Sequence, residues 1–364
     1  MRTTSFIQLV AVNLVVGICL LLAIELAFRL AEKKYWTAPA FRLTRPEPYK
    51  ASPFFSRAFI DESFDQPKEW FVPTGTKIVL PHNYRGRFFN VIDNIRHTVG
   101  HNASPTNHLY IVGGSTVYDS EVPDEYTIAS QLQKLINSAM LNINVVNLGV
   151  TSVHSAQQLE RLQRYVKLKK NDIVIFYDGV NDVVHRFFDR NLDLQIPNTK
   201  IQAITVRIIR GLARRSAFFR WFNETFATKK TFPFDKQFAS KAADDYVAAI
   251  KVAHDYVTSR RAIFYHFLQP TLATKKPKDA YERKLMKTRG EMIPVGLMDV
   301  FEKSYPVIRE RFLPLPYNYD LSDAFDDFTV SPYLDFCHVN EVADKRIAGL
   351  LFETIEHQFQ SKSR

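Results

Sequence analysis

Four short segments of this chain contain the residue types that acyl transfer by a serine requires. They are residues 113–116 (GGST), 147–149 (NLG), 179–182 (GVND) and 335–338 (DFCH). A serine hydroxyl that attacks a carbonyl carbon needs a base to take its proton and hydrogen-bond donors to hold the oxyanion. The base in turn needs a third group that keeps its imidazole in the right tautomer. Together the four segments offer a candidate for each of these roles.

The candidate nucleophile is Ser115, and the candidate oxyanion donors are the backbone N–H groups of Ser115 and Gly149 and the side-chain amide of Asn181. Gly113 and Gly114 permit a tight turn before the serine and a close approach of substrate to the backbone. A helix that begins at Ser115 would add N–H donors and a favourable dipole. Gly149 has no side chain, so we expect its N–H to face the oxyanion unobstructed.

The candidate base is His338, and Asp335 is the candidate partner that orients it. An aspartate three residues before a histidine can turn back onto the imidazole Nδ1–H. Each segment also has a structural interpretation, because serine and aspartate cap helices and Gly and Asn-Asp form turns. A phosphate-binding loop is disfavoured, because no Gly-x-x-x-x-Gly-Lys pattern accompanies Ser115. The catalytic interpretation therefore depends on whether the four segments meet in the fold.

The elements that would position these residues alternate between strands and helices. Apolar runs predict strands, and apolar residues at helical spacing predict helices. The expected strands are residues 108–113, 143–150, 172–178 and 262–270, and the expected helices are residues 126–141, 155–168, 246–257 and 342–359. Such alternation indicates βαβ units and a parallel sheet. Functional residues gather beyond the carboxyl ends of such strands, where Ser115, Gly149 and Asn181 are expected.

Taken together, the four segments resemble the signature blocks of the SGNH (GDSL-type) hydrolases. The resemblance covers roughly residues 108–190 and 240–358 and depends on four weak motifs in the right order. It implies a three-layer α/β/α, flavodoxin-like fold and an esterase, lipase, carbohydrate deacetylase or O-acyltransferase. The first block reads Gly-Gly-Ser here, where the family commonly has Gly-Asp-Ser. By position, the family's nucleophile, two oxyanion donors, base and orienting acid fall on Ser115, Gly149, Asn181, His338 and Asp335.

The N-terminal segment predicts a membrane anchor. Residues 3–24 contain no charged side chain, and a helix of this length can cross a hydrocarbon core of roughly 30 Å. A cleaved signal peptide has a shorter apolar region and a small-residue cleavage site, so an uncleaved single-pass anchor is favoured over it and over a buried core helix. The flanking charges alone slightly favour a cytoplasmic domain by the positive-inside rule, but large domains translocate largely regardless of charge. From the chemistry of the four segments we expect an extracytoplasmic catalytic domain, periplasmic or outside the cell.

The chain is expected to have an anchor with its flank, a proline-rich irregular stalk or wrapping segment, and a hydrolase-like domain with two insertions. These are residues 1–34, 35–107 and 108–360, with the insertions at about 186–240 and 273–313. Residues 186–290 hold 22 Lys and Arg against 9 Asp and Glu, a net +13 that exceeds the +10 of the whole chain. Residues 204–222 mix arginines with large apolar residues and predict an amphipathic helix that covers the cleft or contacts anionic lipid or glycan.

Composition excludes several other classes of protein. With 46% hydrophobic and 24% charged residues the chain is globular, so wholesale disorder, collagen and coiled coil are excluded. Two cysteines, Cys19 and Cys337, cannot build a Cys-rich metal site, and no other cluster has metal-ligand spacing, so we predict no metal and no cofactor. No nucleic-acid-binding motif accompanies the positive charge, so nucleic acid is disfavoured as a partner. Asp182, His154, His185 and His266 are interpreted as structural.

Three functional hypotheses follow from the sequence. The first is a serine esterase that hydrolyses an acyl ester, with acetyl among the candidate groups, through an acyl-serine intermediate. The second is a polysaccharide O-acetyltransferase that uses the same residues, and the third is a non-catalytic glycan-binding or scaffold protein. The complete set of Ser115, Asn181, Asp335 and His338 argues against the third. The anchor points to an acylated cell-surface glycan or a lipid as the substrate.

Overall fold

The structure is a computed structural model, and it describes residues 2–36, 45–64, 71–73, 79–194, 216, 218, 236–287 and 296–360. The chain forms two compact units, which we describe separately. One unit is Met1–Thr44 with Arg190–Thr231, and the other is Arg45–Asp189 with Phe232–Arg364. All strands of the described residues belong to the second unit.

A long helix, α1 (Arg2–Trp36), dominates the described part of the first unit. Its stretch Ala11–Leu30 has a mean hydropathy of 2.4, and none of that stretch is buried. It is the one helix among the described residues that is long and apolar enough to cross a membrane. Glu25 and Arg29, the charges inside this stretch, form an ion pair one helical turn apart, at 2.6 Å.

The basic segment 204–222 lies outside the described residues, except for Ser216 and Phe218. The Ser216 hydroxyl donates a hydrogen bond to Glu25 at 2.6 Å, and Phe218 makes an edge-to-face contact with Phe28. The amphipathic helix predicted for this segment, and its contact with an anionic surface, therefore stay predictions.

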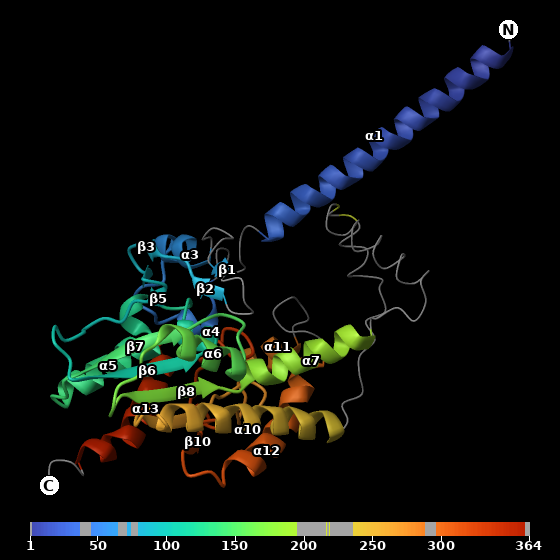
Figure 1. The fold of residues 1–364 in the computed structure, drawn as a ribbon. Coiled ribbons are helices and arrows are strands. Elements are labelled where there is room, and N and C mark those ends of the chain that lie inside the picture. The colour runs from blue at the N-terminus through green and yellow to red at the C-terminus, as the bar shows by residue number, and fades with distance from the viewer. Residues whose placement is uncertain are drawn as a thin grey trace. The chain divides into compact units, whose positions relative to one another are not determined.

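The second unit is built on an eight-stranded sheet of order β10-β9-β8-β6-β7-β5-β4-β3 (Figure 1). Five neighbouring strands run parallel, and four of them are the strands predicted from the sequence. In chain order their arrangement is 2-1-3-4-5, which is the flavodoxin-like order. The five strands are β6 (Asn107–Gly113), β7 (Ile143–Gly149), β8 (Ile173–Asp178), β9 (Ile263–Leu268) and β10 (Asn318–Asp320).

Helices cover both faces of this sheet, which confirms the predicted three-layer α/β/α fold. Right-handed crossovers place α6, α10 and α12 on one face and α5 on the other, because the strand order reverses direction at β6. Contacts of α10 with α6 and α12, and of α13 with α5, agree with this arrangement. These helices are α5 (Ile128–Ser138), α6 (Ser155–Tyr165), α10 (Lys236–Thr258), α12 (Leu297–Phe312) and α13 (Glu341–Gln360).

The range 35–107, predicted to be irregular, contributes regular structure to this unit. Its strand β5 pairs antiparallel with β7, β4 pairs with β5, and β3 pairs with β4. These three short strands extend the parallel sheet on one side. Strands of two or three residues are too short to show a hydrophobic periodicity, so they cannot be predicted from the sequence pattern. The described elements of this range are η1 (Glu47–Tyr49), α3 (Arg57–Phe64), β1 (Phe71–Pro73), β2 (Val79–Pro81), β3 (Tyr84–Arg85), β4 (Asn90–Ile92) and β5 (Ile95–Arg96).

One of the two predicted insertions belongs to the core of the fold. Residues 273–313 contain α12, which is the crossover helix between the parallel strands β9 and β10 and packs on α10. The prediction of an insertion at 273–313 is wrong for α12, because the strand β10 that follows it has only three residues and shows no strand pattern in the sequence. The remaining elements are α4 (Ser115–Tyr118), η2 (Asp124–Tyr126), α11 (Ala280–Lys287) and α7 (Val180–Leu194), whose residues from 190 on are assigned to the first unit.

Candidate active site

The ends of β6 and β8 bring Ser115 and Asn181 together. The two strands are neighbours, and their carboxyl ends meet where the strand order reverses, the usual ligand position in such sheets. A Cβ added to Gly114 would lie 2.3 Å from Asn181 Nδ2, so the amide rests directly against the residue before the serine. A Cβ added to Gly113 would lie 2.6 Å from the Tyr177 carbonyl oxygen. Atoms of the protein itself therefore leave little room for a side chain at either glycine, and the close approach of substrate that the sequence predicted stays a prediction.

Ser115, His338 and Asp335 form a continuous hydrogen-bonded chain. The distance from Ser115 Oγ to His338 Nε2 is 2.8 Å, and that from His338 Nδ1 to Asp335 Oδ2 is 2.6 Å. With Nδ1–H donating to the aspartate, Nε2 is left to accept the serine proton. The imidazole is 19% exposed, and the carboxylate is 5% exposed. The base is therefore within reach of a substrate, while its orienting acid is shielded from water.

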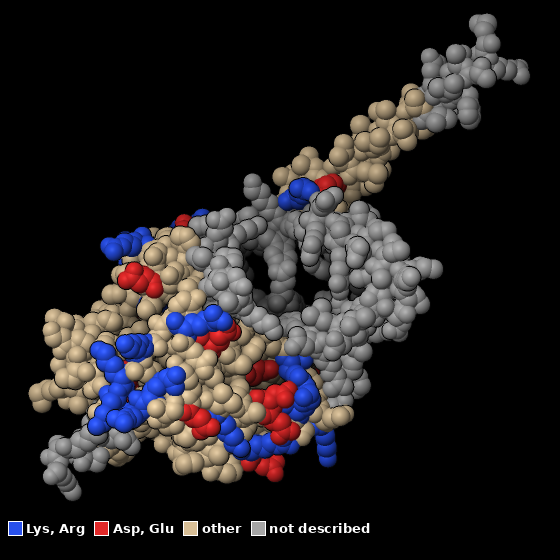
Figure 2. Space-filling model, in the orientation of Figure 1, with Lys and Arg blue, Asp and Glu red and all other residues tan. Residues whose placement is uncertain are grey.

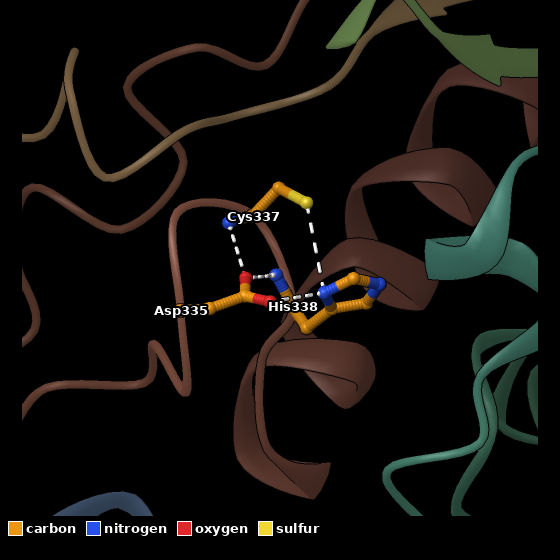
Figure 3. Close-up of side chains that lie close together, drawn as sticks. All are labelled: Asp335, Cys337 and His338. Carbon is orange, nitrogen blue, oxygen red and sulfur yellow. Dashed lines mark hydrogen bonds and ion pairs between the residues drawn. The ribbon is translucent and has the colours of Figure 1, made fainter. Parts of the chain in front are cut away.

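A tight loop before α13 holds the acid and the base in register (Figure 3). Asp335 Oδ1 accepts the backbone N–H groups of Cys337 and His338, each at 2.8 Å. The loop is closed by a bridge between Tyr333 and Val339. Because one carboxylate oxygen is held by the backbone, the other is fixed toward the imidazole.

The pKa of Asp335 is lowered and the pKa of His338 is raised, as expected when the two side chains form a charged pair. Burial alone raises the pKa of Asp335, but the His338 imidazole and the hydrogen bonds that the carboxylate accepts lower it below its ordinary value. Burial alone lowers the pKa of His338, but Asp335, Cys337 and Glu121 raise it well above its ordinary value. The imidazole is thus a stronger base than a free histidine, and it is neutral only at higher pH.

Asp335, Cys337 and His338 also have the composition of a metal site, since their ligand atoms lie within 4.8 Å of one another. The Cys337 sulfur lies 3.7 Å from His338 Nδ1 (Figure 3), but burial raises the pKa of its thiol to about 11. A metal at this point would need the thiolate and would displace the bond between the imidazole and Asp335. The hydrogen bonds present are those of an acid-base pair, so the absence of a metal stays our prediction.

The candidate oxyanion donors differ in whether their N–H groups already donate to another acceptor in the protein. Asn181 Nδ2 donates one N–H to the Val153 carbonyl at 2.9 Å, which leaves its second N–H for a ligand. The N–H of Gly149, predicted to be unobstructed, instead donates to Asn147 Oδ1 at 2.9 Å. The helix that begins at Ser115 is only four residues long, so its dipole contributes less than the sequence interpretation assumed.

Gly149 is required for a reason other than the one predicted. A Cβ at this position would lie 2.1 Å from the Tyr118 amide nitrogen and 2.5 Å from the Val117 carbonyl carbon, both in the backbone of α4. The end of β7 therefore passes directly beneath the helix that carries Ser115, and only glycine fits.

Gly149→Ala should consequently lower the free energy of unfolding by about 3 kcal/mol or more, because backbone atoms cannot rotate away from the added methyl group. Thermal unfolding of the detergent-solubilised chain measures the effect. Gly349→Ala is the matched control: nothing lies within 4 Å of that position on α13, so the same substitution should leave stability unchanged or raise it. Equal stability of the two variants would contradict the close approach.

The loop between β7 and α6 is a part of the site that sequence reasoning missed. Its Val153 carbonyl accepts the Asn181 amide, and its Val150 N–H donates to the Gly113 carbonyl at 3.1 Å. The loop makes these contacts through its backbone carbonyl and N–H groups. No side-chain pattern in the sequence of the loop could therefore predict them. His154 caps α6 at the end of the same loop, which agrees with its structural interpretation.

His266 lies in a buried hydrogen-bond network beneath the site. Its Nε2 is 2.6 Å from the Tyr246 hydroxyl, which donates to Asp178 Oδ1 at 2.6 Å, and its Nδ1 is 2.9 Å from Asn318 Oδ1. The network joins β8, β9, β10 and α10. Its position inside the sheet fits the structural interpretation of this histidine.

A groove of about 380 Å³ lies away from this site. Its lining includes Arg164, Lys167, Tyr256 and Arg260, from the C-terminal ends of α6 and α10. These helices run antiparallel to the strands, so the groove lies at the amino ends of the strands. None of the predicted site residues lines it.

Comparison with known proteins gives distant structural similarity only. No protein-family model and no curated protein matches the sequence. Similar solved structures include a lipolytic G-D-S-L family protein from Veillonella parvula, 10% identical with a TM-score of 0.39 over 68% of this chain and 97% of that one. A catalytic mutant of the acetylxylan esterase Axe2 from Geobacillus stearothermophilus is 14% identical, with a TM-score of 0.38 over 69% and 94% of the two chains. The esterase EstA from a Pseudoalteromonas species is 12% identical, with a TM-score of 0.36 over 70% and 99%.

Proposed function

We propose that this protein is a serine ester hydrolase that acts through an acyl-serine intermediate. The observation that carries the proposal is the chain of hydrogen bonds from Ser115 through His338 to Asp335. Ser115 Oγ attacks the acyl carbonyl carbon while His338 Nε2 takes its proton, and the imidazolium then protonates the departing alcohol oxygen. Water, deprotonated by the same imidazole, attacks the acyl-serine and releases the carboxylic acid and the free serine.

The oxyanion of each tetrahedral intermediate would be held by the backbone N–H of Ser115 and the second N–H of Asn181. The Asn181 amide rests against Gly114, the residue directly before Ser115. Gly149, the third predicted donor, would take part only if its N–H exchanged Asn147 Oδ1 for the oxyanion. The two free donors are enough for a functioning oxyanion hole.

Asn181→Ala is expected to lower kcat by about 10²- to 10³-fold while KM changes little, because the amide binds the oxyanion more strongly than the ground-state carbonyl. Steady-state kinetics on a soluble acyl ester measure the split. Asn171→Ala, in the turn before β8, is the matched control and should leave kcat unchanged. A rise in KM at unchanged kcat would argue against the proposed role.

The substrate we propose is an acylated cell-surface glycan or a lipid. Helix α1 would serve as a single-pass anchor that keeps the catalytic unit at the membrane, on the extracytoplasmic side. On the face drawn in Figure 2, Lys and Arg side chains lie beside Asp and Glu side chains in several places, and at the lower left a group of Lys and Arg side chains lies together. The anionic contact that we propose involves the basic segment 204–222, most of which lies outside the described residues.

A panel of acyl esters of increasing chain length, hydrolysed by the detergent-solubilised full-length chain, tests the proposal and defines the acyl group. Acetate release from an acetylated donor, measured with and without an acceptor glycan, separates hydrolysis from O-acetyl transfer. Acceptor-independent release supports the hydrolase, and release that requires the acceptor supports the transferase. If a fluorophosphonate probe fails to label Ser115 in the folded protein, the non-catalytic alternative is favoured instead.

A further inference from the structure

Side chains near the start of α7 hold the loop that joins β7 to α6. Asn181 Nδ2 donates to the Val153 carbonyl at 2.9 Å, and His185 Nε2, one turn later, is 2.8 Å from the Ser152 carbonyl oxygen. A carbonyl can only accept, so His185 must carry its proton on Nε2. Two successive carbonyls of the loop are thus tied to one face of α7.

Asp182 ties the next part of the same loop. Its carboxylate accepts the Ser155 hydroxyl at 2.5 Å and the Ser155 N–H at 3.3 Å. Three side chains of α7 therefore bind residues 152–155, which we call the clamped loop.

The clamped loop includes a residue that would not hold its conformation unaided. Ser152 has a φ of +58°, in the left-handed region that is sterically unfavourable for a residue other than glycine. Its carbonyl is the one that His185 binds, and the His185 ring meets the His154 ring edge to face at 5.1 Å. The contacts with α7 thus fix a strained turn in place.

This turn lies beside the nucleophile. The Val153 carbonyl oxygen would be 3.7 Å from a Cβ on Gly114, the residue before Ser115. Because an amide is planar, tying one N–H of Asn181 to a fixed carbonyl also fixes the direction of its other N–H. The position of the clamped loop therefore decides where the free Asn181 N–H points.

We propose that Asp182 and His185 are positioning residues, which hold the clamped loop so that Asn181 aims its free N–H at the acyl oxygen above Ser115. The inference rests on the proposed esterase function and adds two residues to its machinery. Neither residue touches the substrate. Their effect is carried through Val153 and Asn181.

For each of the two residues, one substitution removes the hydrogen bonds and a second keeps at least one of them. His185→Phe keeps a ring against His154 but cannot donate to Ser152, whereas His185→Gln keeps an N–H donor. Asp182→Ala removes both acceptors, whereas Asp182→Asn keeps one. Burial and the nearby charge of Asp178 raise the pKa of Asp182 to about 7, so asparagine also removes a charge that this site tolerates poorly.

The experiment measures kcat and KM for a soluble acyl ester with the detergent-solubilised full-length variants. We expect His185→Phe and Asp182→Ala to lower kcat by about 10- to 100-fold with KM little changed, and His185→Gln and Asp182→Asn to recover most of the loss. In an Asn181→Ala background, His185→Phe should lower kcat by no more than about twofold, because the donor it positions is already gone. His357→Phe, at an exposed position on α13, is the matched control and should leave kcat unchanged.

The outcomes separate this inference from the proposed function. If Ser115→Ala abolishes turnover but His185→Phe and Asp182→Ala keep the wild-type kcat, the positioning role alone is overturned. An equal loss of kcat from His185→Phe with and without the Asn181 amide also overturns it, since that indicates a general structural defect. Full turnover by Ser115→Ala overturns the esterase itself, and the positioning role with it.

Discussion

Replacing Ser115 with alanine is expected to lower kcat for ester hydrolysis by about 10⁴- to 10⁶-fold. The variant keeps the oxyanion donors and the His338–Asp335 pair, but it has no atom that can form the acyl-enzyme. Any residual rate would come from the attack of water on a bound ester near the intact donors. Steady-state turnover of a soluble ester and covalent labelling by a fluorophosphonate measure the two aspects of the loss.

The loss of kcat in Ser115→Ala and the loss of kcat in His338→Ala should not multiply in the double variant. The hydroxyl and the imidazole act in one step across a 2.8 Å hydrogen bond, so the double variant should be about as slow as either single variant. Ser138→Ala, at the exposed end of α5, is the matched control and should keep the full rate. Two independent losses that multiply would mean that Ser115 and His338 do not share a step, and an unchanged rate in Ser115→Ala would remove the nucleophile altogether.

The sequence allowed the central part of the fold to be predicted, because its strands are long and apolar. All six residues of β8 are buried, and the expected ranges of β6, β7 and β9 agree with the observed strands within a few residues. In a parallel sheet the ends of such strands share one edge. The strand pattern therefore predicted that Ser115 and Asn181 lie at the same edge of the sheet, and the pairing of β6 with β8 brings them together.

The parts that could not be predicted share a physical cause, which is that backbone atoms rather than side-chain patterns define them. The strands β3, β4, β5 and β10 have only two or three residues each, too few to show an alternation of apolar and polar side chains. Gly149 was expected to offer its N–H, but its position beneath α4 is a matter of backbone packing that no spacing in the sequence reveals.

The contact of His338 with Ser115 could be predicted from the sequence only in part. The residue types predicted the chemistry, and the three-residue spacing predicted the contact with Asp335. The distance of 2.8 Å to the serine, however, depends on the loop between Tyr333 and Val339 and on the docking of α13, which are long-range features. The four motifs therefore made the site a specific hypothesis, and the fold supplied its geometry.

Asp335→Asn is expected to lower the maximal kcat by about 10⁴-fold and to shift the pH dependence of kcat/KM toward acid. The amide would present an N–H to His338 Nδ1, which forces the proton onto Nε2, the atom that must accept from Ser115. The same change removes the carboxylate that raises the pKa of His338, so the burial that lowers this pKa is less opposed. Because kcat/KM rises with pH as the imidazole loses its proton, the rise should occur at lower pH in the variant.

A pH profile of kcat/KM, measured from about pH 5 to about pH 10, distinguishes this role from a structural one. A loop that merely lost its shape would lower the rate at every pH and leave the midpoint of the rise in place. Asp327→Asn, which breaks an exposed ion pair with Arg346, is the matched control and should change neither the rate nor the midpoint. If the midpoint stays or moves toward alkaline pH in Asp335→Asn, the charge of Asp335 does not act on the base. The 2.6 Å contact would then serve only to hold the loop before α13 in shape, and His338 would lack the partner that makes it a catalytic base.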